Sequence, residues 1–327
     1  MTNISRWLPI LGMVFCCVSC TGKGSEPSDT SVQDTDETND TDTNDTDTND
    51  SDTSDTSDTS DTGSTTEPLV EVDVLVIGSG PAGLSAAWKA KEEGATVLVL
   101  EMADVAGGAG WYGHRFFGAG TIYQENSDIE DSPEFALSEW NNFTGGDASD
   151  PLVEQFVYAS ADVVEWLIED LGNSLISMGQ DDPAGSVERM HKIQYEEGGP
   201  VEPLVLLMED DIWLESMADA LAVDADGAVI GAWFTDQKTG EEAWIRAAST
   251  VVATGGFARD EERMASHMPE ITGQEVLFEA AYTSVGGGHA LLEDIDAAMQ
   301  NEGNVGVYLH SVPEYREGYP DHEALWL

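Results

Sequence analysis

The feature that most constrains this chain is a glycine-rich turn between an apolar run and a helix-compatible segment. The run from Val72 to Ile77 leads into the sequence GSGPAG at 78–83, and a second apolar run from Ala95 to Leu100 ends at Glu101. A strand, a glycine turn, a helix and a second strand in this order form the context in which G-x-G-x-x-G binds the diphosphate of a dinucleotide. The sequence therefore predicts a dinucleotide-binding α/β fold.

Each residue of the glycine turn has an expected role. Gly78 permits the tight turn, Gly80 lets the backbone approach a diphosphate, and Gly83 lets the helix pack closely on the strand. Pro81 and Ala82 lie where this helix begins, and its positive N-terminal end can face phosphate groups. All five residues are predicted to contact the cofactor.

An acidic residue and a Gly-Gly pair follow the second apolar run. Glu101 lies where a carboxylate can accept hydrogen bonds from a ribose hydroxyl, and Met102 beside it belongs to the same predicted contact. Five residues separate Glu101 from Gly107 and Gly108. In NAD enzymes the chain after the acid usually continues into the next helix, whereas in many FAD enzymes a Gly-Gly pair passes the diphosphate and the flavin. The spacing favours FAD, and an NAD-dependent dehydrogenase is the rival interpretation.

A second signal lies in the C-terminal part of the chain. The segments 228–234 and 242–246 flank the loop 236–240, whose sequence DQKTG is typical of a hairpin. The apolar stretch that follows ends at Ala253, Thr254 and Gly255. In this order after the first motif, the pattern predicts that the chain returns to the cofactor at these three residues.

The first twenty residues are interpreted as a targeting segment. Arg6 precedes a short apolar run, and the segment ends at Cys20, which suggests a bacterial lipoprotein signal with Cys20 as the lipidated residue. An ordinary secretory signal cut near Ser19 is the alternative. All three cysteines lie in this segment, so the globular part is predicted to carry any electrons on a bound organic cofactor.

Residues 21–68 are expected to be a disordered linker rich in Asp, Thr and Ser. This tract holds fifteen acidic residues and one lysine, and it has almost no apolar side chains. A spacer between a membrane and a catalytic domain is preferred over a divalent-cation site, because calcium loops need glycine-punctuated turns. The net charge of the chain is −52, of which residues 69–327 carry −39. Such a surface excludes nucleic acid as a plausible partner and leaves only the lipid anchor to reach a membrane.

The chain resembles a family of FAD-dependent oxidoreductases that contains soluble fumarate reductases, urocanate reductase and 3-ketosteroid dehydrogenases. The resemblance rests on the motifs above and on the stretches FFGAGTIYQENSDIEDSPEF, DASDPLVEQFVYASADVVEWLIEDLG and STVVATGGFARDEER. It implies a glutathione-reductase-like FAD-binding Rossmann domain with a mostly parallel sheet, a crossover β-hairpin layer and helices outside. It also implies that Gly118 and Gly120 lie beside the flavin ring. The chain departs from the family where Gly287 replaces an aspartate.

The same resemblance divides the chain and implies an activity. An FAD-binding domain is expected over 69–305, and 306–327 is expected to begin a truncated capping domain in which His310 would be the catalytic residue. The implied reaction is hydride transfer between the flavin and an activated C=C bond of a small organic substrate. A degenerate or truncated FAD-binding surface lipoprotein is the alternative. Export as an outer-membrane lipoprotein facing the periplasm or the cell surface would allow a quinol-linked or cytochrome electron donor.

Several other polar and aromatic residues have both a functional and a structural interpretation. His114 is interpreted as a polar loop residue in preference to a covalent flavin attachment. Arg189 and His191 are interpreted as a local counter-charge to Glu188, Glu196 and Glu197, with an anion-facing role as the alternative. Helical spacing over 152–168 predicts a buried helix face. The tryptophans Trp140, Trp166 and Trp213 are interpreted as packing residues.

Overall fold

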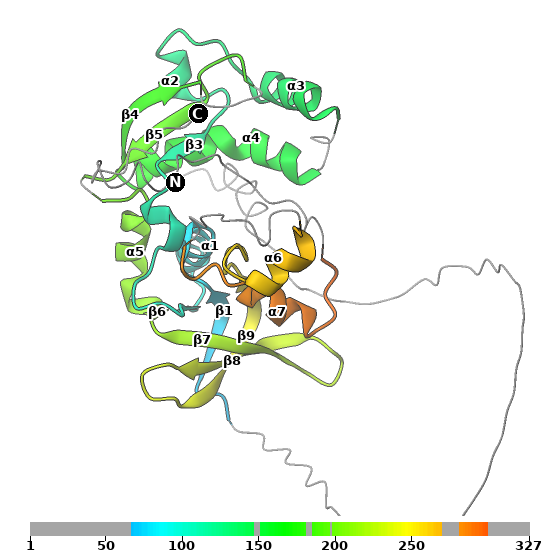
Figure 1. Ribbon diagram of the computed structural model, residues 1–327. Coiled ribbons are helices and arrows are strands. Elements are labelled where there is room, and N and C mark those ends of the chain that lie inside the picture. Colours follow the sequence, from blue (N-terminus) through cyan, green and yellow to red (C-terminus); the bar gives the residue numbers. More distant parts are fainter. Residues whose placement is uncertain (1–66, 147–150, 181–184, 197, 270–280, 300–327) are drawn as a thin grey trace, which may run out of the picture. The chain divides into compact units, whose positions relative to one another are not determined.

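A six-stranded sheet is the larger of two sheets in the computed structural model, which describes residues 67–146, 151–180, 185–196, 198–269 and 281–299 (Figure 1). Its strand order is β6-β2-β1-β9-β8-β7. The strands are β1 (Val70–Ile77), β2 (Val97–Leu100), β6 (Ile212–Trp213), β7 (Ser216–Val223), β8 (Val229–Asp236) and β9 (Glu242–Val252). β6, β2, β1 and β9 run parallel, and β8 and β7 continue the sheet antiparallel. The predicted α/β fold with a mostly parallel sheet is confirmed.

The two apolar runs of the first motif form the middle of this sheet. β1 pairs with β2 from Val74↔Val97 to Ile77↔Leu100, and all four residues of β2 are buried. Strands that are covered on both faces read as nearly continuous apolar runs. This is why β2, with the sequence VLVL, contains no polar residue.

β9 has two partners along its length. Its first half pairs antiparallel with β8, from Thr235↔Glu242 to Gly231↔Arg246, and its second half pairs parallel with β1 up to Ile77↔Val252. The predicted hairpin at 236–240 is therefore confirmed. The segment 242–246 and the apolar stretch after it, however, form one continuous strand of eleven residues.

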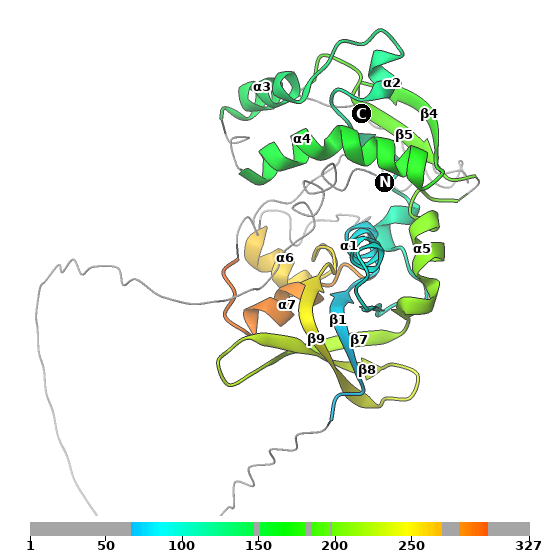
Figure 2. The same ribbon diagram turned by 180° about the vertical axis from the view of Figure 1, so that it is seen from behind.

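A second, three-stranded antiparallel sheet has the order β3-β5-β4. It consists of β3 (Arg115–Phe117), β4 (Ser174–Gly179) and β5 (Met190–Gln194). Both views place α4 (Pro151–Glu165) beside β3 and β5 (Figures 1 and 2). The buried side chains of β5 are those of His191 and Ile193. Because one of them is polar, the sequence of β5 does not show a clear alternation of apolar and polar residues.

The remaining helices are short or of medium length. They are α1 (Pro81–Glu92), α2 (Ile122–Glu125), α3 (Pro133–Thr144), α5 (Glu202–Met208), α6 (Glu261–His267) and α7 (Gly287–Glu293). Two 3-10 turns (Gly108–Trp111, Glu209–Asp211) and a π turn (Trp166–Asp170) complete the described elements. Among the described residues, no helix has the length and apolar character that a membrane crossing requires.

Two apolar clusters cover the faces of the large sheet. One joins Val76, Leu84, Val164 and Ile193, so β1, α1, α4 and β5 share a core. The other includes Leu75, Leu98, Phe234 and Leu291. The predicted tryptophan packing is confirmed, since Trp166 belongs to the first core and the other two tryptophans pack against apolar clusters.

The predicted buried face over 152–168 is only partly correct. Val157 and Val164 of α4 are fully buried, but the side chains of Leu152 and Phe156 are 69% and 40% exposed. The helical period was correctly identified, while the extent of burial at the N-terminal end of α4 was overestimated. Phe156 instead stacks on Phe117 and Trp140 at the margin of a small cluster.

Candidate functional site

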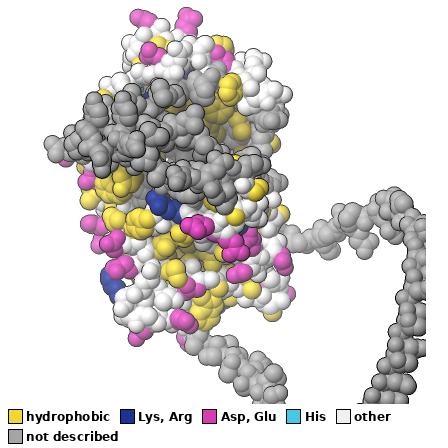
Figure 3. Space-filling view, viewed as in Figure 1, with side chains coloured by type: hydrophobic (Ala, Val, Ile, Leu, Met, Phe, Trp, Pro, Cys, Tyr) yellow, Lys and Arg dark blue, Asp and Glu magenta, His cyan; other side chains and the backbone are white. Residues whose placement is uncertain are grey.

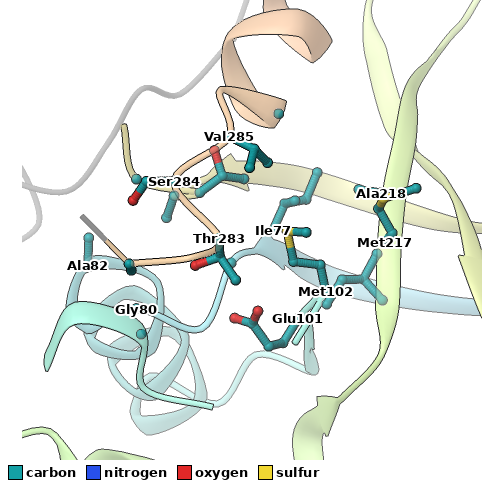
Figure 4. A pocket seen from close by; sticks show the side chains of 18 of the residues that line it. Ile77, Gly80, Ala82, Glu101, Met102, Met217, Ala218, Thr283, Ser284 and Val285 are labelled. Atoms are coloured by element: carbon teal, nitrogen blue, oxygen red, sulfur yellow. The ribbon is translucent and has the colours of Figure 1, made fainter. Parts of the chain in front are cut away.

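A cavity of about 300 Å³ lies at the C-terminal ends of β1, β2 and β9. Parallel α/β sheets bind ligands at this edge. Figure 4 shows side chains from the glycine turn, β2, β7 and the segment before α7 around one space. Ten of the predicted site residues line it: Gly78, Gly80, Pro81, Ala82, Glu101, Met102, Gly108, Ala253, Thr254 and Gly255.

Two glycines of the turn are required by the protein itself. Gly78 has φ +100°, and a Cβ there would lie 2.5 Å from the Ala253 carbonyl oxygen. A Cβ on Gly83 would lie 1.9 Å from the carbonyl oxygen of Gly78. Gly83 does not line the cavity, and its role is the close packing of α1 on β1. These contacts explain how a strand can turn so directly into a helix.

No contact within the protein requires a glycine at position 80. Its φ of −67° suits any residue, and a Cβ there would have no neighbour within 4 Å. Gly287 at the start of α7 also lines the cavity, and its Cβ direction is equally open. At both Gly80 and Gly287 the protein has room for a side chain, yet the cavity wall has none there. This space fits a group held close to the backbone at the N-terminus of α1, as a diphosphate would be.

Glu101 is buried and ties the glycine turn to the end of β2. Its Oε2 accepts hydrogen bonds from the Ser79 backbone N–H at 2.9 Å and from Ser79 Oγ at 2.5 Å. Its Oε1 accepts from the Ala103 N–H at 2.8 Å. The carboxylate still lines the cavity, so its remaining lone pairs can accept from a ligand hydroxyl. Ser79, which sequence reasoning passed over, fixes the orientation of this acid.

The Ala-Thr-Gly turn after β9 completes the opposite wall. Thr254 Oγ1 accepts a hydrogen bond from the Gly288 N–H at 3.0 Å, and a Cβ on Gly288 would lie 2.1 Å from that oxygen. Gly286 adopts φ +73° as the N-cap of α7. The Gly286–Gly288 run therefore makes a backbone turn and a close contact with Thr254 without any side-chain carboxylate.

The structure does not bring all predicted site residues into this cavity. Gly107 lies beside it, where a Cβ would come 2.3 Å from Trp111 Nε1. Gly118 is enclosed by Thr121, Val164 and His191, and Gly120 is next to Pro133. The predicted contact of Gly118 and Gly120 with a flavin ring stays a prediction. His310 and Cys20 lie outside the described residues, so their roles stay predictions as well.

Two segments that sequence reasoning missed also line the cavity. Ser216, Met217 and Ala218 come from β7, and Thr283, Ser284 and Val285 precede α7. The first segment carries no glycine or charge pattern that would mark it, whereas the second directly precedes the glycine run 286–288. A hydrogen bond from the Ser216 N–H to the Glu101 carbonyl oxygen, at 2.8 Å, holds the start of β7 beside the cavity.

The predicted partners of Arg189 were wrong. The Arg189 side chain is fully buried and donates two hydrogen bonds to Asp131, from Nε at 2.8 Å and from NH2 at 2.7 Å. Its NH1 donates to Glu139 at 2.6 Å. The acids that neutralise it come from the segments before and within α3, not from the neighbouring glutamates. Full burial also removes the anion-facing alternative.

His191 is also fully buried, in the core of the small sheet. Its Nδ1 lies 2.9 Å from the Arg189 carbonyl oxygen and its Nε2 lies 2.9 Å from Thr121 Oγ1. Because a carbonyl oxygen can only accept, Nδ1 carries the proton and Nε2 accepts from the threonine hydroxyl. Burial lowers the pKa of His191 below its usual value, which favours the neutral ring.

We expect His191 to remain neutral at pH values where an exposed histidine takes up its proton, near about 6.5. The unfolded chain then binds the extra proton, so the free energy of unfolding should decrease as the pH falls below the unfolded-state pKa. Titration of the histidine ring resonances by NMR, with a His191→Gln variant for assignment, tests this. A His191 midpoint at or above the usual value would contradict the buried neutral ring.

His114 lies in a second, open cavity of about 520 Å³. The ring is half-buried, with Nδ1 3.3 Å from the Ile193 carbonyl oxygen. It is not among the residues that line the first cavity. These contacts agree with a polar loop residue and give no support to a covalent flavin bond.

Comparison with known proteins gives consistent matches. A model of the FAD binding domain family matches residues 73–316. The cytochrome-type fumarate reductase of Shewanella frigidimarina is 32% identical over 211 residues, which are 62% of this chain and 36% of that protein. Urocanate reductase of Eggerthella lenta is 30% identical over 242 residues, 70% of this chain and 39% of that protein.

Solved structures show the same relationship. The open conformation of a flavocytochrome c3 fumarate reductase superposes with a TM-score of 0.64 at 28% identity, covering 70% of this chain and 41% of that one. A 3-ketosteroid-delta4-(5alpha)-dehydrogenase from Rhodococcus jostii RHA1 gives 0.63 at 25% identity, covering 71% and 55%. The chain thus spans well under two thirds of the length of the relatives it matches.

Proposed function

Because the chain belongs to the FAD binding domain family, we propose that it is the cofactor-binding part of an FAD-dependent oxidoreductase that reduces an activated C=C bond of a small organic substrate. The observation that carries this proposal is the cavity at the ends of β1, β2 and β9, where the glycine turn, Glu101 and the Ala-Thr-Gly turn meet. The matches to fumarate and urocanate reductases favour an activated double bond over other acceptors.

Different residues of the cavity would hold different parts of FAD. The open backbone at Gly80 and the N-terminus of α1 would hold the diphosphate, since backbone N–H groups and the helix dipole attract negative charge there. Glu101, fixed by Ser79, would accept from the ribose hydroxyls. Thr254 and Gly287 would close the opposite side. When bound, FAD supplies the hydride-transfer chemistry, and the protein supplies orientation and electrostatics.

We extend the proposal to the cellular location of the protein and to its electron donor. A lipidated Cys20 and an acidic spacer would place the FAD-binding domain outside the inner membrane, at the outer membrane facing the periplasm or the cell surface. There, a cytochrome or quinol-linked donor would supply electrons, as the name fumarate reductase (cytochrome) suggests for the Shewanella relative. His310 would contribute to the substrate site, whose other residues are expected beyond the FAD-binding domain.

The test is flavin retention followed by reoxidation. We expect the purified full chain, expressed with riboflavin supplied, to retain stoichiometric FAD. After anaerobic reduction with dithionite, fumarate or urocanate should reoxidise the bound flavin faster than it reoxidises free reduced FAD. Succinate, which has no double bond, is the matched control.

Two outcomes separate the competing interpretations. A colourless protein that cannot take up added FAD would overturn the proposal as a whole. Retained flavin that no unsaturated acid or ketone reoxidises would favour the degenerate FAD-binding lipoprotein. An NAD-dependent dehydrogenase would show neither flavin absorbance nor flavin release on heating.

A further inference from the structure

The second cavity has an unusual charge for this protein. Residues 69–327 contain forty-nine acidic residues against ten lysines and arginines. The face in Figure 3 shows the same imbalance, with acidic side chains spread widely and few basic ones. The second cavity is nevertheless lined by Lys192 and His114, together with Trp111, Gln194, Gly198 and Gly199.

Lys192 has no ion-pair partner among the described residues. Of the four lysines in the described part of the chain, Lys89, Lys91 and Lys238 each form an ion pair with a carboxylate. Within those same residues, no acidic group comes within ion-pair distance of Lys192. The nearby carboxylate of Glu202 packs against Gly198, where a Cβ would come 1.7 Å from its Oε2, and makes no ion pair with Lys192.

Strand register increases the positive charge near this lysine. Arg115 of β3 lies directly opposite Lys192 of β5 in the antiparallel ladder. Arg115 has an interaction of its own and does not line the cavity, so an anion in the cavity would meet Lys192 and not Arg115.

The other walls of the cavity are held in place by hydrogen bonds and close packing. Trp111 Nε1 donates to the Ala106 carbonyl oxygen at 2.7 Å, and the Cα of Trp111 lies 2.7 Å from where a Cβ of Gly199 would be. His114 uses Nδ1 toward the Ile193 carbonyl oxygen, which leaves Nε2 for a ligand. A fixed tryptophan, a lysine and a histidine thus line one open space.

We propose that this cavity binds the oxyanion of a small molecule, a carboxylate or a phosphate, through Lys192 and His114. Lysine ammonium and imidazole groups form charge-assisted hydrogen bonds with such oxyanions. The site is separate from the FAD cavity, because the two share no lining residue. The proposed ligand is a molecule other than the cofactor, which the FAD-saturated protein should still bind.

Calorimetric titration of the FAD-saturated protein with sodium phosphate and with sodium acetate tests the proposal. Saturation with FAD occupies the other site that attracts phosphate, and sodium chloride keeps the ionic strength constant. We expect one of the two anions to bind, and Lys192→Gln to weaken its binding at least about tenfold, as the loss of a hydrogen bond to a charged group implies. His114→Gln should weaken it less.

The matched control is Lys238→Gln, which removes an exposed lysine that pairs with Glu215 away from the cavity. This variant should bind the anion like the wild type. Tighter binding of acetate identifies a carboxylate ligand, and tighter binding of phosphate identifies a phosphate ligand. No detectable binding of either anion, or equal binding by Lys192→Gln and wild type, overturns the proposal. The titration can also be run without FAD, so failure of the cofactor assignment would be seen separately.

Discussion

Replacing Arg189 by methionine should cost the folded protein about 3–5 kcal/mol, because it leaves a buried carboxylate without its cation. The side chains of Arg189 and Asp131 are both fully buried, and the two groups share a bidentate contact. Methionine fills a similar volume but cannot donate a hydrogen bond. The midpoint of urea unfolding, followed by circular dichroism, measures the loss.

The cost arises from the stranded charge and not from lost packing, which a second variant can show. Adding Asp131→Asn to Arg189→Met removes the uncompensated carboxylate and should recover part of the stability. Arg246→Met is the matched control, since Arg246 is exposed on β9 and its replacement should change the free energy of unfolding by less than about 0.5 kcal/mol. A loss for Arg189→Met as small as that for Arg246→Met would contradict the buried ion pair.

Glu139 is the third member of this cluster, and Arg189 also stabilises its charged form. Burial raises the pKa of Glu139, but hydrogen bonds from Ser186 and Arg189 outweigh it and hold the pKa below its usual value. Glu139 is 15% exposed, so its replacement by glutamine should be less costly than loss of Arg189. The cluster joins the segment before α3, α3 itself and the residue that precedes β5.

Local patterns in the sequence were enough to predict the first half of the site. The glycine turn, the acid after β2 and the Ala-Thr-Gly turn each depend on neighbours along the chain, and the cavity contains all three. Gly78 and Gly83 could be assigned because tight turns and close helix packing leave few alternatives to glycine. The hairpin at 236–240 was predictable for the same reason.

Contacts between distant segments were not predictable from the same patterns. Arg189 pairs with acids 58 and 50 residues earlier in the chain, whereas the sequence alone suggested the adjacent glutamates. β7 reaches the cavity through the ladder to β8 and the contact with Glu101. The second cavity combines a loop, β5 and a Gly-Gly turn that no single motif connects. In each case the missing information was a contact between segments that are distant in the sequence.

Replacing Gly80 should weaken FAD binding without weakening the fold, which separates a ligand requirement from a structural one. A Cβ at this position meets no protein atom within 4 Å, and the backbone conformation suits other residues. Gly80→Ala should therefore leave the unfolding temperature of the FAD-free protein unchanged or slightly raised. In the complex, the added methyl group would occupy space that the diphosphate needs, and such overpacking costs about 1–3 kcal/mol, or roughly tenfold to a hundredfold in affinity.

Fluorescence titration of the FAD-free variants with FAD measures this loss, and Gly80→Val should lose more affinity than Gly80→Ala. Gly113→Ala is the matched control, because its Cβ would make only an ordinary contact at 3.6 Å with the Ala109 carbonyl oxygen, and Gly113 does not line the cavity. Wild-type affinity in both Gly80 variants would mean that the diphosphate lies elsewhere. A Gly80→Ala protein that unfolds at a clearly lower temperature would instead show that the glycine serves the fold, as Gly78 and Gly83 do.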